Sequence, residues 1–124
     1  MNDFSGKRCV FIDDDNMNLM IVSKKLENHN LIVDKGKNMA ELFELLKTNE
    51  YDIIFLDDMM PKMSGTQAMK ELKKQNFSRP IVVITGNCED PNSRDNYINE
   101  GFDEFISKPV KDEVLDQILD LFLK

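Results

Sequence analysis

Five short apolar runs, separated by longer segments, constrain the fold of this chain most strongly. The runs span residues 9–12, 31–33, 53–56, 81–84 and 105–106. The first, third and fourth are continuous rather than alternating and contain many β-branched residues, a pattern typical of strands buried on both faces of a parallel sheet. We therefore predict five strands, at least three of which are covered on both faces.

The segments between these runs carry apolar residues at helical spacing. These residues are Leu19, Val22 and Leu26; Leu42, Leu45 and Leu46; Met69 and Leu72; and Val114, Leu115, Ile118, Leu121 and Phe122. The polar, Asn-rich segment 91–100 is predicted to form a shorter helix. Each connection is too long for a hairpin and suits a helical crossover, so the sequence predicts an α/β fold with helices on both faces of a doubly wound parallel sheet. Right-handed crossovers leave few strand orders, of which we adopt 2-1-3-4-5.

The size and charge of the chain narrow its functions. Its 124 residues suit a single domain, with no internal repeat, low-complexity tract or interdomain linker. Its net charge of −7 opposes contact with phosphate backbones, so we expect no direct nucleic-acid binding. No apolar run approaches membrane-spanning length and the N-terminus does not resemble a signal peptide, so we expect no membrane insertion and a cytoplasmic location. In that compartment Cys9 and Cys88 should be free thiols.

Acidic residues directly follow two of the predicted strands. Asp13–Asp15 follow the first strand and Asp57–Asp58 follow the third. In an open α/β sheet, ligands bind beyond the carboxyl ends of the strands, and in the order 2-1-3-4-5 the first and third strands are neighbours. Three or more carboxylates would then converge and, because they repel one another, would need a cation. Oxygen donors without His or Cys favour Mg²⁺ or Ca²⁺, and Mg²⁺ commonly shares phosphate oxygens, so the sequence predicts a magnesium site that handles phosphate.

Four features at different strand ends also have ordinary structural explanations. The acids at 13–15 could cap a helix, and Asp57 with Asp58 could begin a loop. Thr85 could simply end the fourth strand, and Lys108 could be a solvated lysine after the fifth. Because all four lie at the carboxyl ends of strands in one predicted sheet, we favour one shared site over four coincidences.

Four segments resemble the receiver domains of two-component response regulators, over nearly the whole chain. They are IDDDNMN at 12–18, YDIIFLDDMMPKMSG at 51–65, PIVVITGN at 80–87 and GFDEFISKPV at 101–110. The resemblance implies one receiver domain over residues 1–124, with a flavodoxin-like (βα)5 fold. It also implies Mg²⁺-dependent transfer of a phosphoryl group from a histidine kinase or histidine phosphotransfer protein. Any catalysis would be limited to this transfer and slow autodephosphorylation. An unidentified downstream protein or domain would respond to the phosphorylated form.

The same resemblance assigns the acceptor and metal ligands. Asp57 would be the phosphoacceptor and a metal ligand, as a carboxylate can form an aspartyl-phosphate intermediate. Asp14 would bind Mg²⁺ directly, Asp13 would hold it through water, and the backbone carbonyl of Met59 would be the third protein ligand. Met59 and Asn87 stand at the two positions that tune dephosphorylation in this family. Since Met orients water poorly, we expect a phosphoryl lifetime that is not especially short.

The resemblance also implies phosphoryl-binding and switch residues. The Thr85 hydroxyl and the Lys108 ammonium would bind phosphoryl oxygens, and the bond between Lys108 and Pro109 would be a cis peptide. Thr85 and Phe105 would form the switch, which repacks the face made by segment 91–100, the fifth strand and the last helix. Because Phe105 lacks a hydroxyl, we expect its ring to favour an inward position before activation.

Several nearby residues carry weaker expectations. Asp15 and Asp58 are extra acids that we expect to be solvated. His29 is the only histidine and is expected at the surface, away from the acids, so a partner must supply the phosphoryl group. Gly65 is expected to permit a positive φ in the loop beyond the acceptor.

Two other interpretations stay open at this point. A receiver-like module could act by protein binding without phosphorylation, and binding of beryllofluoride with Mg²⁺ would exclude that interpretation. The acids at 13–15 also resemble the start of haloacid-dehalogenase-like phosphatases, whose nucleophile follows the first strand. Phosphorylation of Asp13 rather than Asp57 would identify such an enzyme.

Overall fold

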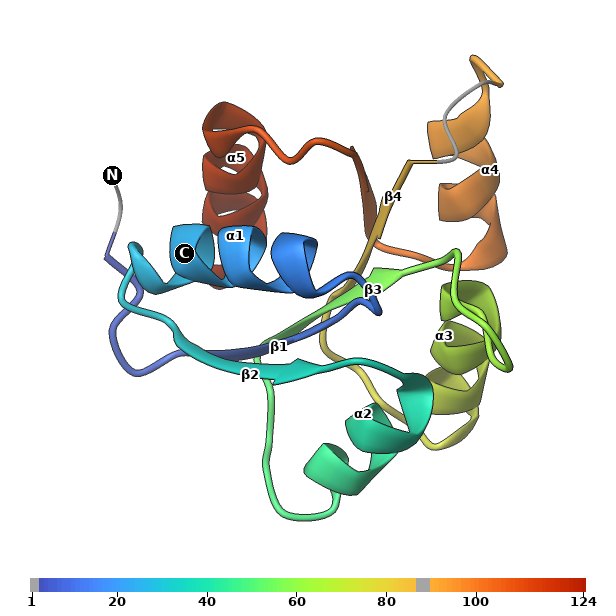
Figure 1. Cartoon of the computed structure of the whole chain (residues 1–124), viewed down its shortest axis with the longest axis horizontal. Helices are drawn as coiled ribbons and strands as arrows, with labels where there is room; N and C mark the ends of the chain where they lie inside the picture. Colours follow the sequence, from blue (N-terminus) through green and yellow to red (C-terminus); the bar gives the residue numbers. More distant parts are fainter. Residues whose placement is uncertain (1–2, 87–89) are drawn as a thin grey trace.

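Strands and helices alternate along the described part of the chain, as predicted. The computed structural model describes residues 3–86 and 90–124. Its elements are β1 (Arg8–Ile12), α1 (Asn16–Glu27), β2 (Ile32–Gly36), α2 (Met39–Leu46), β3 (Ile53–Asp57), α3 (Gly65–Lys74), β4 (Ile81–Thr85), α4 (Ser93–Glu100), β5 (Glu104–Ser107) and α5 (Asp112–Leu123). The five strands form one parallel sheet in the order β2-β1-β3-β4-β5 (Figure 1). The predicted fold class and strand order are therefore confirmed.

The burial of each strand follows from its place in the sheet. Every residue of β3 and β4 is buried, as are all residues of β1 except Arg8. These are the three continuous apolar runs, and they form the centre of the sheet. The edge strands differ, because only Gly36 of β2 and Ile106 of β5 are buried.

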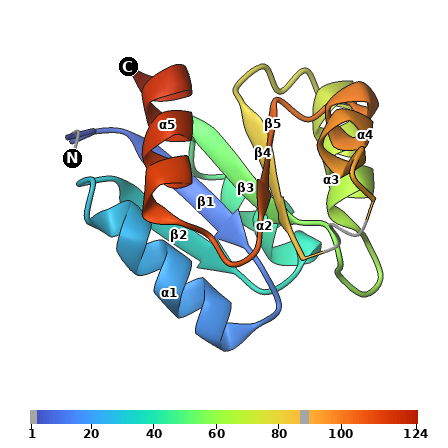
Figure 2. The same cartoon turned by 90° about the horizontal axis from the view of Figure 1, so that it is seen from above.

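The helices divide the core into two layers. Helices α1 and α5 cover one face of the sheet, and α2, α3 and α4 lie on the other (Figures 1 and 2). Successive residues of β1 alternate between the layers: Cys9 and Phe11 pack toward α1 and α5, and Val10 and Ile12 pack toward α2 and α3. This alternation is the period-two geometry of a strand that is buried on both sides.

In the last helix, one residue that was predicted to face the core is exposed instead. In α5, Leu119 is fully buried, whereas Leu121 is 65% exposed. Leu115, Ile118, Leu119 and Phe122 share one helical stripe at spacings of three and four, and Leu121 lies off this stripe. The prediction for Leu121 was wrong because spacing from Ile118 alone fits a helix but does not fix which stripe faces the sheet.

The expectation of a surface histidine was also wrong. His29, which follows α1, is 3% exposed, and its Nε2 lies 2.7 Å from Oδ1 of Asp116 in α5. A polar ring can be buried where a partner is supplied, and α5 supplies it.

The prediction of free thiols can be compared with the structure for only one of the two cysteines. Cys9 is buried and has a free thiol, and burial raises its pKa well above the usual range. Cys88 and Asn87 lie outside the described residues. None of the helices in the described part of the chain has the length and apolar character needed to cross a lipid bilayer.

Candidate functional site

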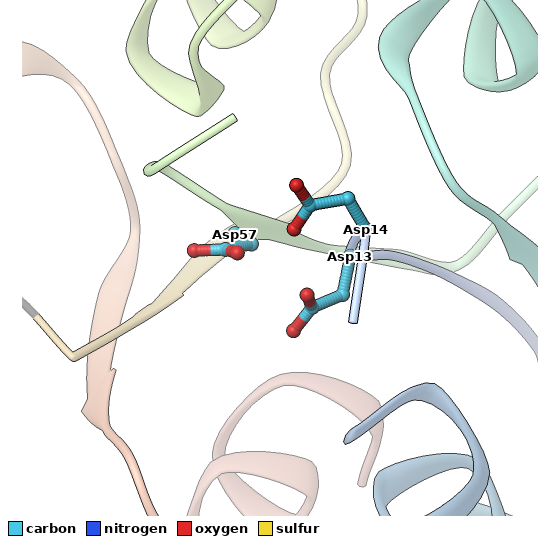
Figure 3. Close-up of side chains that lie close together, drawn as sticks. All are labelled: Asp13, Asp14 and Asp57. Carbon is cyan, nitrogen blue, oxygen red and sulfur yellow. The ribbon is translucent and has the colours of Figure 1, made fainter. Parts of the chain in front are cut away.

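Three carboxylates meet at one edge of the sheet. Asp13 and Asp14 follow β1, Asp57 ends β3, and the two strands are hydrogen-bonded neighbours. One carboxylate oxygen from each of the three residues lies within 4.8 Å of the other two. Figure 3 shows the side chains projecting from the two adjacent strand ends to the same side. The predicted convergence is therefore confirmed for these three residues, of which Asp13 and Asp57 are buried and Asp14 is exposed.

Asp13 is fixed in place by three hydrogen-bond donors. Its Oδ1 accepts from the Asp15 backbone N–H at 2.9 Å, and its Oδ2 accepts from the Asn18 side-chain amide and from Lys108 Nζ, the latter at 3.0 Å. Asn18 had no predicted role at the site. The sequence hints at a role for Asn18 only through its position in the first turn of α1, three residues after Asp15.

Lys108 joins the two buried carboxylates. It follows β5 and reaches back so that Nζ lies 3.0 Å from Asp13 Oδ2 and 3.2 Å from Asp57 Oδ2. Burial opposes its charge, but the hydrogen bonds and the attraction of both carboxylates outweigh burial and raise the pKa of Lys108. The ammonium therefore stays charged at neutral pH. The peptide bond between Lys108 and Pro109 is cis.

The charges at the site are not balanced by Lys108 alone. Burial, followed by repulsion from Asp13, raises the pKa of Asp57 from 3.8 to about 6, although Lys108 and the Met59 backbone N–H act in the opposite direction. Three carboxylates face one ammonium, which leaves excess negative charge. A donor set made only of oxygens, with this excess charge, fits a hard divalent cation.

The remaining predicted site residues that the structure describes are Thr85, Met59 and Phe105. Thr85 is fully buried at the end of β4, one residue beyond the strand partner of Asp57. The Met59 backbone N–H donates to Asp57 Oδ1 at 3.2 Å, and the Met59 side chain is 61% exposed. Phe105 pairs with Val83 farther back along β4. Phe105 is half-buried and packs against the core layer under α2, α3 and α4.

The two extra acids are not simply solvated. Asp15 is exposed but caps α1, because its side chain accepts from the backbone N–H groups of Met17 and Asn18. Asp58 is half-buried and accepts hydrogen bonds from Thr66 and Tyr97. The capping explanation is therefore right for Asp15, and the expectation of a solvated Asp58 was wrong.

Gly65 is required for a different reason than expected. It begins α3 and is not among the described residues with positive φ, whereas Lys62 in the preceding loop has φ 69°. A Cβ at Gly65 would lie 2.8 Å from the Asp57 carbonyl oxygen and 3.0 Å from Asp58 Cα. Glycine therefore permits the start of α3 to pack directly against the end of β3.

Comparison with known proteins agrees with this architecture. Residues 9–120 match the family model of the response regulator receiver domain. The chain is 24% identical over 92% of its length to the autoinducer 2 sensor kinase/phosphatase LuxQ of Vibrio vulnificus, and 32% identical over 90% to hybrid signal transduction histidine kinase L of Dictyostelium discoideum. It spans only 13% and 7% of these two proteins.

A solved structure of similar size also superposes closely. A two-component response regulator from Clostridium difficile is 28% identical, with a TM-score of 0.84 over 94% of this chain and 95% of that one. The family match covers β2 to β5 and all of β1 except Arg8, and the superposition supports the same fold. This chain belongs to the response regulator receiver domain family of two-component signalling systems.

Proposed function

We propose that residues 1–124 act as one phosphoacceptor unit, in which Asp57 receives a phosphoryl group in a Mg²⁺-dependent reaction. The observation that carries this proposal is the cluster of Asp13, Asp14 and Asp57, whose carboxylate oxygens lie within 4.8 Å, with Lys108 between the two buried acids. Structural ion pairs alone would not need the exposed third carboxylate. The cluster combines a nucleophile with the charges that a phosphoryl group requires.

The acidic residues would provide the metal ligands. Asp13, Asp14 and Asp57 bring three carboxylates together, and the backbone carbonyl of Met59 would complete an oxygen-only donor set of the kind that Mg²⁺ prefers. When bound, Mg²⁺ supplies positive charge that neutralises the transferring phosphoryl group. Asn18 and the Asp15 backbone N–H hold the Asp13 carboxylate in one orientation.

Asp57 would act as the nucleophile. A carboxylate oxygen attacks phosphorus, an O–P bond forms, and the P–N bond of a phosphohistidine breaks with its electron pair retained by the donor imidazole. Lys108 already lies 3.2 Å from Asp57 Oδ2 and would pair with a phosphoryl oxygen after transfer. The Thr85 hydroxyl would bind another oxygen, and Thr85 with Phe105 would repack the face made by α4, β5 and α5.

The phosphoryl donor must lie outside residues 1–124. His29 is the only histidine of the chain, and it is buried against Asp116. The curated relatives include sensor and hybrid histidine kinases, which supports a histidine kinase or histidine phosphotransfer protein as the donor. The downstream protein or domain is not specified by this comparison. We place the reaction in the cytoplasm, in keeping with the match to the receiver domains of two-component signalling.

Acetyl phosphate provides the direct test. Wild-type protein incubated with acetyl phosphate and Mg²⁺ should gain the mass of one phosphoryl group, and Asp57→Asn should not. Omitting Mg²⁺ or adding a chelator should prevent the gain in wild type. Peptide mapping that placed the group on Asp13 would favour the phosphatase interpretation. No gain, together with no binding of beryllofluoride and Mg²⁺, would favour a module that acts without phosphate.

A further inference from the structure

Asp58, one residue beyond the proposed acceptor, connects β3 to two helices. Its Oδ1 accepts from the Thr66 backbone N–H at 2.8 Å and from Thr66 Oγ1 at 2.9 Å, at the start of α3. Its Oδ2 accepts from the Tyr97 hydroxyl of α4 at 2.8 Å. Hydrogen bonds to an ionised carboxylate are stronger than those between neutral groups. The position of Tyr97 is thus tied to the residue beside Asp57.

Tyr97 in turn contacts the predicted switch residue. Its ring stacks on Phe105, with centroids 5.6 Å apart and an interplanar angle of 20°, and meets Phe102 edge-on at 5.8 Å. Aromatic pairs of this kind contribute beyond the area that they bury. Tyr97 therefore links Asp58 at its hydroxyl end to Phe105 at its ring face. An inward movement of Phe105 would remove one of the surfaces that hold Tyr97.

The other side-chain contacts of helix α4 are mostly polar and lie at the surface: Arg94 pairs with Glu104 of β5, and Glu100 pairs with Lys70 of α3. Among its eight residues, all of which the structure describes, only Ser93 is buried, and its N-cap residue Asn92 makes no side-chain cap hydrogen bond. By contrast, the start of α3 is packed tightly against β3, as the Gly65 contact with Asp57 shows. A change at the acceptor should therefore displace α4 more readily than α3.

We propose that Tyr97 is a positioning residue for the acceptor site, because its bond to Asp58 restrains α4 and Phe105 until a phosphoryl group is present. This inference rests on the proposed function, since it takes Asp57 as the phosphoacceptor. When Thr85 and Lys108 turn to the phosphoryl group and Phe105 moves inward, the stacked ring is lost and the Asp58–Tyr97 bond breaks. A contact made in only one of two states opposes any ligand that favours the other.

The chain offers a matched control for Tyr97. It has two tyrosines and no tryptophan. The other tyrosine, Tyr51, also donates its hydroxyl to an aspartate, Asp34 Oδ2 at 2.7 Å, but it precedes β3 at the end opposite to Asp57. Tyr97→Phe and Tyr51→Phe therefore each remove one hydroxyl bonded to a carboxylate. Only the first removal should affect the acceptor site.

The test measures binding of beryllofluoride with Mg²⁺ by calorimetry. Tyr97→Phe should bind about three- to tenfold more tightly than wild type, the range expected for losing one hydrogen bond that only the unbound state makes. Tyr51→Phe should bind as wild type does. A variant that merely loosened the fold would bind more weakly, so the direction of the change separates positioning from structural support.

Tyrosine emission reports the contact itself. In Tyr51→Phe the only remaining tyrosine is Tyr97, and a carboxylate that accepts from a phenol hydroxyl quenches its fluorescence. Beryllofluoride with Mg²⁺ should therefore raise the emission of Tyr51→Phe and leave that of Tyr97→Phe unchanged. If wild type neither binds beryllofluoride nor accepts phosphoryl from acetyl phosphate, the proposed function fails. If it does either, yet Tyr97→Phe binds no more tightly than Tyr51→Phe or Tyr97 emission stays constant, the positioning role alone is overturned.

Discussion

The α1–α5 side and the α4 side of the molecule are held by different interactions. On the α1–α5 side, buried apolar residues such as Leu119 are joined by two polar side-chain contacts between α5 and the C-terminal end of α1. Lys25 Nζ lies 2.6 Å from Asp112 Oδ1, and His29 Nε2 lies 2.7 Å from Asp116 Oδ1.

On the α4 side, polar contacts predominate. Arg94 donates two hydrogen bonds to Glu104 at 3.0 and 3.1 Å, and Tyr97 donates to Asp58. Only Ser93 of this helix is buried. Helix α4 is visible at the right of Figure 2, beside α3 and on the opposite side of the sheet from α1.

This difference indicates which side can respond to chemistry at Asp57. Apolar burial is non-directional and tolerates small local changes, so the α1–α5 side should behave as one unit with the sheet. A hydrogen bond depends on the orientation of both partners, and one bond of α4 ends at Asp58. Segments with little buried apolar surface also open with lower free energy than the core. We therefore expect phosphorylation of Asp57 to change the position of α4 more than that of α1 or α5.

The largest expected effect tests the apolar contacts of α5. Leu119→Ala should lower the free energy of unfolding by about 2–5 kcal/mol, because Leu119 is fully buried between α5 and the sheet. Leu121→Ala, on the same helix but 65% exposed, should change it by less than about 0.5 kcal/mol. Urea denaturation measures both. Equal effects at the two positions would mean that α5 packs in another register.

The second prediction concerns the charge of the Asp57 carboxylate, which ends the central strand β3. The pKa of Asp57 is raised from 3.8 to about 6, so the folded, metal-free protein binds this proton more tightly than the unfolded chain does. Stability is therefore lost as pH rises from 3.8 to about 6. Asp57→Asn cannot ionise and should raise the free energy of unfolding at neutral pH by about 1–3 kcal/mol.

Denaturation in chelator as a function of pH checks this sign. The advantage of Asp57→Asn over wild type should shrink as pH falls and vanish below about pH 4, where both side chains are neutral. Mg²⁺ should also reduce the advantage by stabilising wild type. An advantage that persisted unchanged into acid would show that the substitution acts through packing rather than charge.

A smaller effect is expected from the contact between His29 and Asp116, which joins α5 to the end of α1. Asp116→Ala removes a partner of the buried His29 and should lower the free energy of unfolding by about 1–2 kcal/mol. Gln117→Ala, at the exposed neighbouring position, should be nearly neutral. Thermal denaturation of the two variants makes the comparison. If Asp116→Ala were as mild as Gln117→Ala, the α1–α5 side would depend on apolar contacts alone.

The fold and the centre of the site could be predicted because they follow from local patterns. Continuous apolar runs mark strands buried on both faces, and residues that end neighbouring parallel strands must share one edge. This reasoning places Asp13 and Asp57 together without any knowledge of side-chain packing. It works because strand order, once given, fixes the positions of strand ends to within a residue or two.

The contacts of α4 and α5 could not be predicted in the same way. Tyr97 and Asp58 are 39 residues apart and meet only because α4 lies beside α3. His29, which follows α1, is buried because Asp116 of α5 supplies a partner for its ring. Such pairs depend on helix rotation and packing, and a weakly amphipathic segment such as α4 leaves its rotation unspecified.

The smallest expected effect on stability addresses whether α4 opens separately from the rest of the fold. Arg94→Ala removes an ion pair with Glu104 in which the Arg94 side chain is 57% exposed, so the midpoint of urea unfolding should change only slightly. Hydrogen exchange of the α4 amides should nevertheless become faster, because Arg94 joins the helix to β5 and only Ser93 of the helix is buried. Lys25→Ala, which breaks the α1–α5 pair with Asp112, should leave α5 exchange at the rate set by global unfolding. If the α4 amides of Arg94→Ala also exchanged only through global unfolding, α4 would belong to the same cooperative unit as α5, and the contrast between the two sides would disappear.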